Sequence, residues 1–480
     1  MRPGSANRNA PPLRLLRALW PCALALWLAL LGTSLPAAAQ EIVLPPSNPL
    51  EVAPAQLEPG YWIRKLERPD RVSMDAAAIE AQNARLRAQD PSWHDLQALP
   101  QTLERSQVED WVRSRSGRPE KALFDADGKQ GTPRQIDRLV DALDLGAIPQ
   151  SQVTRFGLVV RRTSVRTFPT RIRVFSAPGD TDIDRFQETA LFPGTPVVIA
   201  HASRDREWVF VVSPDYTGWV DKAAIAEGSR ADVFGYVQQR PSLLVTGATA
   251  RTAHAPASPA LSELQLDMGT RVPWLSEAPP TAVINGQLAY SSWPVRLPVR
   301  TEDGQLAFAP ALIPRSADVS ERPLPLTPAN VLRQAFKFLG ERYGWGNDYN
   351  ARDCSGFVAE VYRSMGVEMP RNTSDQAKGP AFERTAFDET STAEQRKAAV
   401  RALQVGDLVY IPGHVMMVIG RERGEPWVIH DVQGVSVVNA AGDLQGVPLN
   451  AVSVTPLLPL RNAEGTPFTE RMTAIMRMRR

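Results

Sequence analysis

Hydrophobic positions change their spacing along the chain, and the changes divide it into regions. Between about residues 60 and 150, apolar side chains recur at helical spacing, most clearly over 74–86, where Ser73 is the expected helix cap. No catalytic group stands out among these residues. We therefore expect residues 40–150 to be a polar, proline-rich linker followed by a helical domain.

From about residue 155 the pattern changes to short, strand-like apolar runs separated by turn residues. The first group of runs lies at 158–160, 195–199, 208–212 and 218–220. A second group follows between 271 and 308 and includes Ala289-Tyr290. Regularly spaced short strands are typical of small barrels. Two consecutive small β-barrels are expected, at 151–230 and 231–320.

The last region, residues 321–480, combines both patterns. Thr327-Pro328 is a helix cap followed by proline in the first turn, and a second helix is predicted through Phe357 and Met365 as far as Gly366. Three strand-like runs come next, at 407–411, 414–419 and 427–430. Helices followed by antiparallel strands predict an α+β domain.

The first 39 residues read as a secretory signal. Four arginines precede an apolar run at 19–31, and Ala37-Ala38-Ala39 supplies the small residues of a cleavage site. The run is too short to span a bilayer well, so no retained transmembrane helix is expected. The protein would then be exported, to the periplasm or, in a cell with one membrane, to the exterior.

The charge of the chain names no partner. Its 54 basic and 52 acidic side chains give a net charge of +2, and removal of residues 1–39 leaves 50 and 52. Such a balance provides no strong field for nucleic acid, and none is expected as a partner.

Cleavage of the signal would leave Cys354 as the single thiol, so no intrachain disulfide is possible. A lone cysteine is either a small buried hydrophobic residue or a reactive group. Asp353-Cys354-Ser355-Gly356 directly precedes a predicted helix. Free N–H groups and the helix dipole at that position favour the thiolate, which indicates a nucleophile.

Two of the five histidines, His414 and His430, fall on adjacent predicted strands downstream of the cysteine. His414 is the expected base, and His430 the group that orients its ring. A zinc site is disfavoured because one Cys and two His leave a ligand missing and match no common zinc spacing. No metal and no cofactor are expected.

Five segments in this order resemble the NlpC/p60 cell-wall cysteine peptidases. They are Tyr343-Gly-Trp345-Gly346, Asp353-Cys354-Ser355-Gly356-Phe357, the stretch 370–376, Gly406-Asp407-Leu408-Val409 and Gly413-His414-Val415. The upstream regions resemble longer members with a helical N-terminal clip and two bacterial SH3-like domains. The resemblance implies a papain-like catalytic fold. It also implies hydrolysis of peptidoglycan stem peptides, typically between γ-D-glutamate and a diamino acid.

The resemblance also assigns roles to residues. Cys354 matches the nucleophile, His414 the base and His430 the third polar member. Asp353 and Ser355 match groups that meet a free L-alanine amine and the glutamate carboxylate, although Asp353 is equally suited to cap the helix. Pocket positions are matched by Ser374, Trp345 and, from the first barrel, Tyr216. Asn347 stands where the family often has a second glycine.

Several alternatives stay open at this point. The same triad would serve an amidase or an acyltransferase acting on another cell-wall amide. The chain could also be a peptidoglycan-binding scaffold. The barrels either bind the wall or restrict the pocket to released muropeptides. The oligomeric state and the identity of the diamino acid are not predicted.

Overall fold

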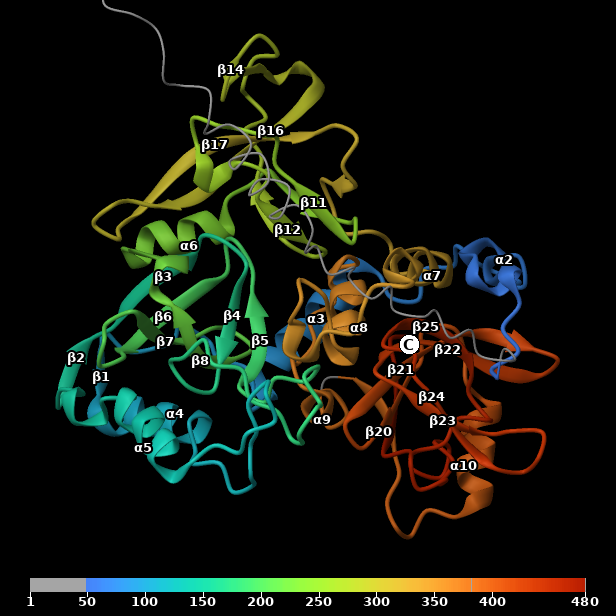
Figure 1. Ribbon diagram of the computed structural model, residues 1–480. Coiled ribbons are helices and arrows are strands. Elements are labelled where there is room, and N and C mark those ends of the chain that lie inside the picture. Colours follow the sequence, from blue (N-terminus) through green and yellow to red (C-terminus); the bar gives the residue numbers. More distant parts are fainter. Residues whose placement is uncertain (1–48, 381, 480) are drawn as a thin grey trace, which may run out of the picture. The chain divides into compact units, whose positions relative to one another are not determined.

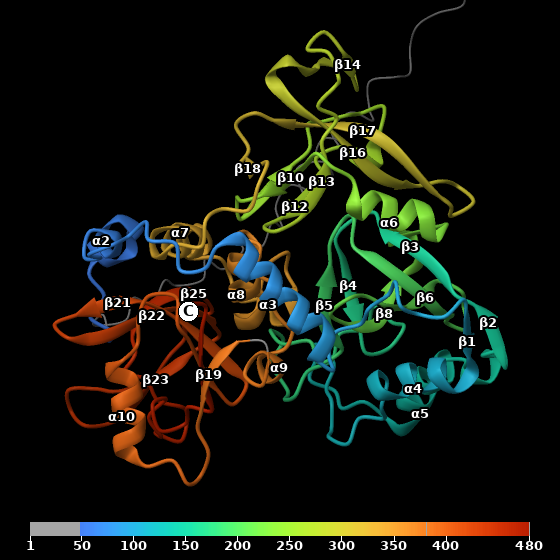
Figure 2. The same cartoon turned by 180° about the vertical axis from the view of Figure 1, so that it is seen from behind.

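The computed structural model describes residues 49–380 and 382–479 (Figures 1 and 2). The predicted signal peptide, residues 1–39, lies outside the described residues. Within the described ranges, no helix combines the length and apolar character needed to cross a bilayer. Residues from Pro49 onward form one compact unit.

The N-terminal region is mainly helical, as predicted. Its elements are η1 (Pro54–Leu57), α2 (Pro59–Ile63), α3 (Ala76–Gln89), β1 (Thr102–Glu104), α4 (Arg105–Arg115), α5 (Pro133–Ala142) and η2 (Leu145–Ala147).

The cap of α3 is Asp75 and not Ser73, which corrects the sequence expectation. Asp75 Oδ1 accepts a hydrogen bond from the N–H of Ala78 at 2.8 Å. Ser73 donates its own backbone N–H to Leu326 at 2.8 Å, and the adjacent Met74 forms a β-bridge with the same residue. This extended pairing delays the start of the helix.

The first β module is a seven-stranded antiparallel sheet in the order β5-β4-β8-β7-β6-β3-β9. Four of its strands correspond to the four predicted runs. The strands are β3 (Arg155–Val159), β4 (Thr163–Arg166), β5 (Gln187–Leu191), β6 (Pro196–Ala202), β7 (Trp208–Val212), β8 (Thr217–Asp221) and β9 (Ile225–Gly228). Short elements β2 (Ser151–Val153) and η3 (Lys222–Ala224) complete the module.

The second β module follows α6 (Arg230–Gln238) and consists of several small sheets. Its elements are β10 (Ser242–Val245), β11 (Thr249–Arg251), η4 (Pro259–Leu261), β12 (Gln265–Asp267), β13 (Arg271–Pro273), β14 (Val283–Ile284), β15 (Gln287–Leu288), η5 (Ala289–Ser291), β16 (Ser292–Arg300), β17 (Leu306–Pro314) and β18 (Val319–Ser320). The predicted strand at Ala289-Tyr290 is instead the 3₁₀ turn η5. Its single buried apolar residue, Ala289, is followed by the exposed Tyr290, so no alternating face exists there.

The third region has the predicted α+β layout. A six-stranded antiparallel sheet, β19-β26-β20-β21-β22-β25, packs against α8 on one face, with Phe357, Val415 and Met417 in that core. The helical elements are α7 (Pro328–Ala335), η6 (Phe336–Phe338), η7 (Trp345–Asn347), α8 (Cys354–Arg363), α9 (Thr373–Gln376) and α10 (Ala393–Arg401). The strands are β19 (Glu383–Ala386), β20 (Leu408–Ile411), β21 (His414–Glu422), β22 (Glu425–Val432), β23 (Val435–Val438), β24 (Leu444–Val447), β25 (Ala451–Pro456) and β26 (Ala474–Arg477).

A buried arginine ties the second β module to this region. Arg352 donates to Asp267 at 2.8 Å, to Glu360 at 2.9 Å and to Glu341 at 2.9 and 3.0 Å. Arg352, Asp267 and Glu360 are almost completely buried, and such charges are tolerated only when they are paired and hydrogen-bonded. Arg162 of the first module adds contacts to nearby backbone carbonyls. Both modules are thereby fixed against the loop that leads to Cys354.

Candidate active site

Cys354 is the first residue of α8, as the sequence predicts. The helix begins there because Asp353 caps it, and its Oδ1 accepts the N–H of Gly356 at 2.8 Å. Only 4% of the Cys354 surface is exposed. The sulfur therefore lies at the inner end of a pocket and not on an open surface.

This catalytic pocket has a volume of about 300 Å³ and is lined by two parts of the molecule. The first β module supplies four side chains, and the third region supplies the rest. Six of the eight predicted site residues line it: Tyr216, Trp345, Asp353, Cys354, Ser355 and Ser374. His414 and His430 are not in the lining, although Gly413, directly before His414, is.

The two histidines are in contact with each other. His414 Nε2 lies 2.8 Å from His430 Nδ1, and His430 Nε2 lies 3.0 Å from the Thr455 hydroxyl. Burial lowers the pKa of His414 to about 4. Burial and then the neighbouring His414 lower the pKa of His430 well below its usual value. Both rings are neutral at pH 7, so His414 is able to accept a proton.

The thiol differs from the sequence expectation of a thiolate. Burial, and then the charge of Asp353, raise the pKa of Cys354 to about 12, although hydrogen bonds from the N–H of Val415 and the side chain of Thr373 lower it. Loss of hydration thus outweighs the favourable helix start. The resting group is a neutral thiol.

The backbone of β21 brings His414 next to the sulfur. The N–H of Val415 contacts the thiol, and His414 is the preceding residue, so its Cα is two bonds from that nitrogen. Among the described residues, no hydrogen bond joins Sγ to either imidazole. Likewise, the described ranges contain no group of three or more His, Cys, Asp or Glu side chains placed to hold a metal ion.

Arg371, which the sequence analysis did not single out, organises the polar side of the pocket. It donates to Asp353 Oδ2 at 2.7 Å, to Ser355 Oγ at 2.8 Å and to Asn347 Oδ1 at 2.7 Å. Asp353 therefore serves as helix cap and as ion-pair partner. Arg371 lies in the segment 370–376, one of the five segments that resemble the family, and this was the signal that could have revealed it.

Asn347 follows Gly346 at a position where the family often has a second glycine. Both residues adopt left-handed backbone angles, with φ of 58° for Gly346 and 59° for Asn347. Asparagine tolerates this conformation better than most residues, because its short polar side chain bonds locally. The loop thus keeps a left-handed turn, and the Asn347 side chain becomes an acceptor for Arg371.

The predicted pocket residue Tyr216 contacts two side chains that the sequence did not reveal, Glu188 and Arg115. Tyr216 donates to Glu188 at 2.5 Å, and Arg115 of α4 donates to both of these residues at 3.1 Å. The Arg115 guanidinium also lies over the Tyr216 ring, 4.3 Å from its centre. No local motif marks Glu188 or Arg115, because they meet only when α4 packs on the sheet.

Asp431, directly after His430, is a further unexpected group. Its side chain is completely buried, and neither carboxyl oxygen has a hydrogen-bond partner among the described residues. Burial, and then the charges of Asp353 and Glu341, raise the pKa of Asp431 well above its usual value. Burial thus disfavours the ionised form of this carboxyl.

Comparison with known proteins matches two segments of the chain to known domain families. Residues 340–450 match the NlpC/P60 family, and residues 173–221 match an SH3 domain of the SH3b1 type. A curated relative from Bacillus cereus (strain ATCC 10987 / NRS 248) is named γ-D-glutamyl-L-lysine dipeptidyl-peptidase. It is 28% identical over 169 residues, which cover 34% of this chain and 44% of the relative. The match thus spans less than half of that relative.

A solved structure extends the similarity to most of the chain. The NlpC/P60 endopeptidase from Photobacterium damselae subsp. piscicida aligns with a TM-score of 0.67 at 17% identity, covering 85% of this chain and 94% of that one. At this identity the alignment supports the fold. The chain therefore contains an NlpC/P60 domain, preceded by an SH3 domain, in the fold of an NlpC/P60 endopeptidase.

Proposed function

We propose that the protein is an exported cysteine peptidase that hydrolyses peptidoglycan stem peptides, at the bond between γ-D-glutamate and a diamino acid. The observation that carries the proposal is the position of Cys354. It begins a helix, at the inner end of a polar pocket, beside the backbone of His414. The NlpC/P60 match and the name of the Bacillus cereus relative support the substrate class.

The geometry suggests how the thiol is activated. His414 Nε2 is directed to His430, so Nδ1 is the nitrogen that accepts the thiol proton. To accept the thiol proton at Nδ1, His414 must carry its own hydrogen on Nε2 and donate it to His430 Nδ1. His430 in turn donates from Nε2 to the Thr455 hydroxyl. This chain of contacts fixes the tautomer and orientation of the base. Proton transfer then accompanies attack, since the resting thiol is neutral.

The remaining steps follow from the same groups. Sγ bonds to the scissile carbonyl carbon, and the backbone N–H of Cys354 at the helix start donates to the oxyanion. A donor of this kind is worth about 3–4 kcal/mol in the transition state. His414 passes its proton to the leaving amine, which departs as the acyl-enzyme forms. His414 next takes a proton from water while the hydroxide attacks the thioester carbon. The bond between that carbon and Sγ then breaks, His414 returns the proton to Sγ, and the acid product leaves.

The pocket offers groups for both ends of a γ-D-glutamyl substrate. Glu188 and Tyr216 form a corner that suits an amine, and Arg185 with Ser355 suits a carboxylate. Asp353, assigned to the amine by resemblance, already accepts from Gly356 and Arg371. Glu188 also accepts hydrogen bonds, from Thr167, Tyr216 and Arg115, but its side chain is more exposed than that of Asp353. We therefore assign the amine end to Glu188 and Tyr216, in competition with Arg115.

The decisive experiment compares wild type with Cys354→Ala. Both proteins are incubated with L-alanyl-γ-D-glutamyl-meso-diaminopimelate and with intact sacculi, and products are identified by mass spectrometry. Wild type should release L-alanyl-γ-D-glutamate, and Cys354→Ala should be at least 1,000-fold slower with an unchanged melting temperature. Cleavage by Cys354→Ala at the wild-type rate would falsify the proposal.

The product masses also separate the alternatives. An amidase would release whole stem peptides from glycan, and an acyltransferase would transfer the acyl group to an added amine. A scaffold would bind sacculi without changing them. Export is tested separately by sequencing the N-terminus of protein recovered outside the cytoplasm, which should begin near residue 40.

A further inference from the structure

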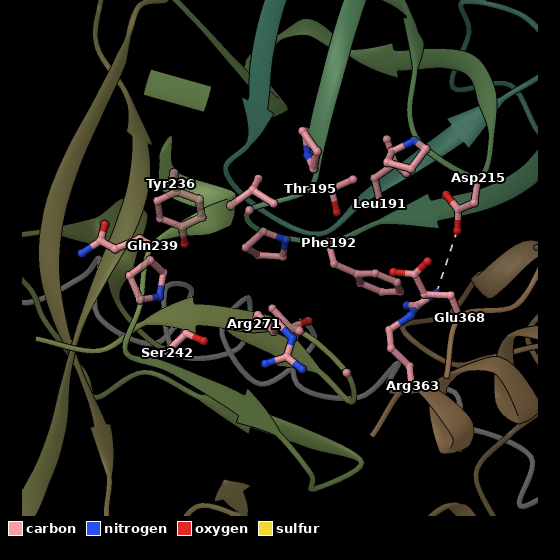
Figure 3. Close-up of a pocket in the computed structure, with 18 of the residues that line it drawn as sticks. Leu191, Phe192, Thr195, Asp215, Tyr236, Gln239, Ser242, Arg271, Arg363 and Glu368 are labelled. Carbon is pink, nitrogen blue, oxygen red and sulfur yellow. Dashed lines mark ion pairs between the residues drawn. The ribbon is translucent and has the colours of Figure 1, made fainter. Parts of the chain in front are cut away.

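A second cavity, of about 270 Å³, is lined by Arg363, the last residue of α8, at the opposite end of the helix from Cys354. We call it the junction pocket. Nine helical steps, or about 14 Å, separate Cys354 from Arg363 along the helix. The cavity forms where several parts of the molecule meet (Figure 3). Its lining includes Leu191 and Thr195 of the first β module, Tyr236 of α6, Ser242 and Arg271 of the second module, and Arg363 of α8.

The junction pocket contains arginines without carboxylate partners. The side chain of Arg271 makes no hydrogen bond and no ion pair within the described part of the chain, although the residue is half-buried. Arg240 donates only to the carbonyls of Val237 and Gln239, at 3.2 and 2.8 Å. Two cations thus face the cavity with no opposite charge of their own.

The two carboxylates of the junction pocket are committed elsewhere. Glu368 accepts a two-pronged contact from Arg87 of α3, at 2.7 and 2.8 Å. Asp215 is paired with Arg363, at 3.9 Å (Figure 3). Burial and then repulsion by Arg240 lower the pKa of Arg271, against the attraction of Glu368. An anion placed between Arg271 and Arg240 would remove this repulsion.

The shape of the pocket suits an extended organic ligand. Leu191, Phe192 and Tyr236 give one apolar wall, while Thr195 and Ser242 add hydroxyl groups. A neighbouring cavity of about 870 Å³ shares Arg240, Arg271 and Arg363 with it. This neighbouring cavity alone exceeds what an inorganic ion requires, and its volume falls in the range of small-ligand sites.

Gly269 shapes the wall next to Arg363. Its φ is +86°, and a Cβ at this position would lie 2.6 Å from Arg363 Cδ. The absence of a side chain therefore lets the stem of Arg363 lie against the second module. This close approach holds the end of α8 beside Arg271.

We infer that the junction pocket is a second binding site, for a carboxylate-bearing peptide, in which Arg271 and Arg240 hold the carboxylate. The planar guanidinium fork binds a carboxylate through two parallel hydrogen bonds. The choice of a peptide rests on the proposed function, because the substrate and products of that reaction carry several carboxylates. Bound there, a stem peptide would anchor the enzyme while Cys354 remains free.

The test is calorimetric titration of Cys354→Ala protein with L-alanyl-γ-D-glutamate, which bears two carboxylates. Two sites are expected, one in each pocket. Adding Arg271→Gln should weaken one site at least tenfold and leave the other unchanged, while Arg271→Lys should give an intermediate loss. Arg315→Gln is the matched control, since Arg315 is exposed on the same module and stacks on Trp293 outside the pocket. Melting temperatures verify that every variant is folded.

Three results of these titrations would overturn the inference. One site in both proteins, or two sites insensitive to Arg271→Gln, overturns the inference. Inorganic phosphate that binds the Arg271-dependent site as tightly as the dipeptide also overturns it, because the pocket would then select any anion. Wild-type cleavage of the tripeptide is measured in parallel. If cleavage occurs while the titrations fail, only the junction site is wrong; if cleavage is absent, the proposed function fails.

Discussion

The catalytic pocket and the junction pocket lie at opposite ends of α8. The carboxylates of both pockets have arginine partners, but the catalytic pocket has one arginine without an ion pair among the described residues, Arg185, whereas the junction pocket has two, Arg240 and Arg271. In the catalytic pocket each carboxylate has an arginine, Asp353 with Arg371 and Glu188 with Arg115. In the junction pocket, Arg271 has no partner among the described residues. Paired charges hold a pocket rigid before substrate arrives, whereas an unpaired charge is available to a ligand. The comparison therefore separates groups fixed for chemistry from groups placed for binding.

The largest effect is expected when the pairing in the catalytic pocket is broken. Arg371→Met leaves Asp353 as a buried carboxylate without a cation, and loss of one partner of a buried pair costs about 3–5 kcal/mol. The free energy of unfolding, measured in urea, should fall by that amount. Arg371→Lys keeps the charge and should lose less. A loss below 1 kcal/mol for Arg371→Met would show that the pairing is not structural.

Burial of Cys354 and the charge of Asp353 also predict that the Cys354 thiol is alkylated slowly at neutral pH. Burial and Asp353 raise the pKa of Cys354 to about 12. As long as the pH is below that pKa, the ionised fraction of the thiol therefore rises tenfold with each unit of increasing pH. Alkylation by iodoacetamide should accelerate about 100-fold between pH 7 and pH 9. Asp353→Asn should react faster at each pH, because it removes the second-largest cause of the shift. A rate that is already constant at pH 7 would indicate a preformed thiolate.

Substitution of Arg115 should have a smaller effect, which depends on whether the substrate has a free amine. Arg115→Gln frees Glu188 from its cation and should favour substrates with a free amine. We expect the ratio of kcat/KM for the free tripeptide over its N-acetylated form to rise about tenfold, equivalent to about 1.4 kcal/mol. Arg113→Gln on the exposed face of the same helix is the control, since the only ion pair of Arg113 within the described ranges is with Glu109. An unchanged ratio would remove Glu188 from amine recognition.

The smallest effect sharpens the contrast between the two pockets. Arg271→Gln removes a charge that is repelled by Arg240 and has no ion pair to lose, so the free energy of unfolding should change by less than about 0.5 kcal/mol or rise slightly. The change is measured by urea unfolding of Arg271→Gln in parallel with Arg371→Met. A loss above 1.5 kcal/mol for Arg271→Gln would mean that this arginine supports the fold.

Local patterns predicted the elements that carry the chemistry. The helix at Cys354 and the strands that carry His414 and His430 follow from capping residues and alternating apolar runs, which act over a few positions. The catalytic roles of these three residues remain predictions. Ser73 was wrong as a cap, because its backbone pairs with Leu326 from a distant segment.

The features that the sequence did not reveal depend on distant contacts. Glu188 reaches the pocket because β5 packs against η7, where Trp345 donates to the Gln187 carbonyl at 3.1 Å. Arg115 arrives from a helix more than 70 residues upstream of Glu188. The thiolate expectation failed for a related reason, since a helix start is visible in sequence but burial of the sulfur is not.

The salt-bridged cluster around Arg352 has a consequence for protein engineering. A fragment of residues 321–480 would lose the Asp267 carboxylate and the Ala248 carbonyl, both of which Arg352 contacts at 2.8 Å. The cluster would then be partly exposed and short of acceptors directly upstream of Cys354. The domain formed by residues 321–480 is therefore not independent of its neighbours, and fusing it to another targeting domain would require the second β module to be included.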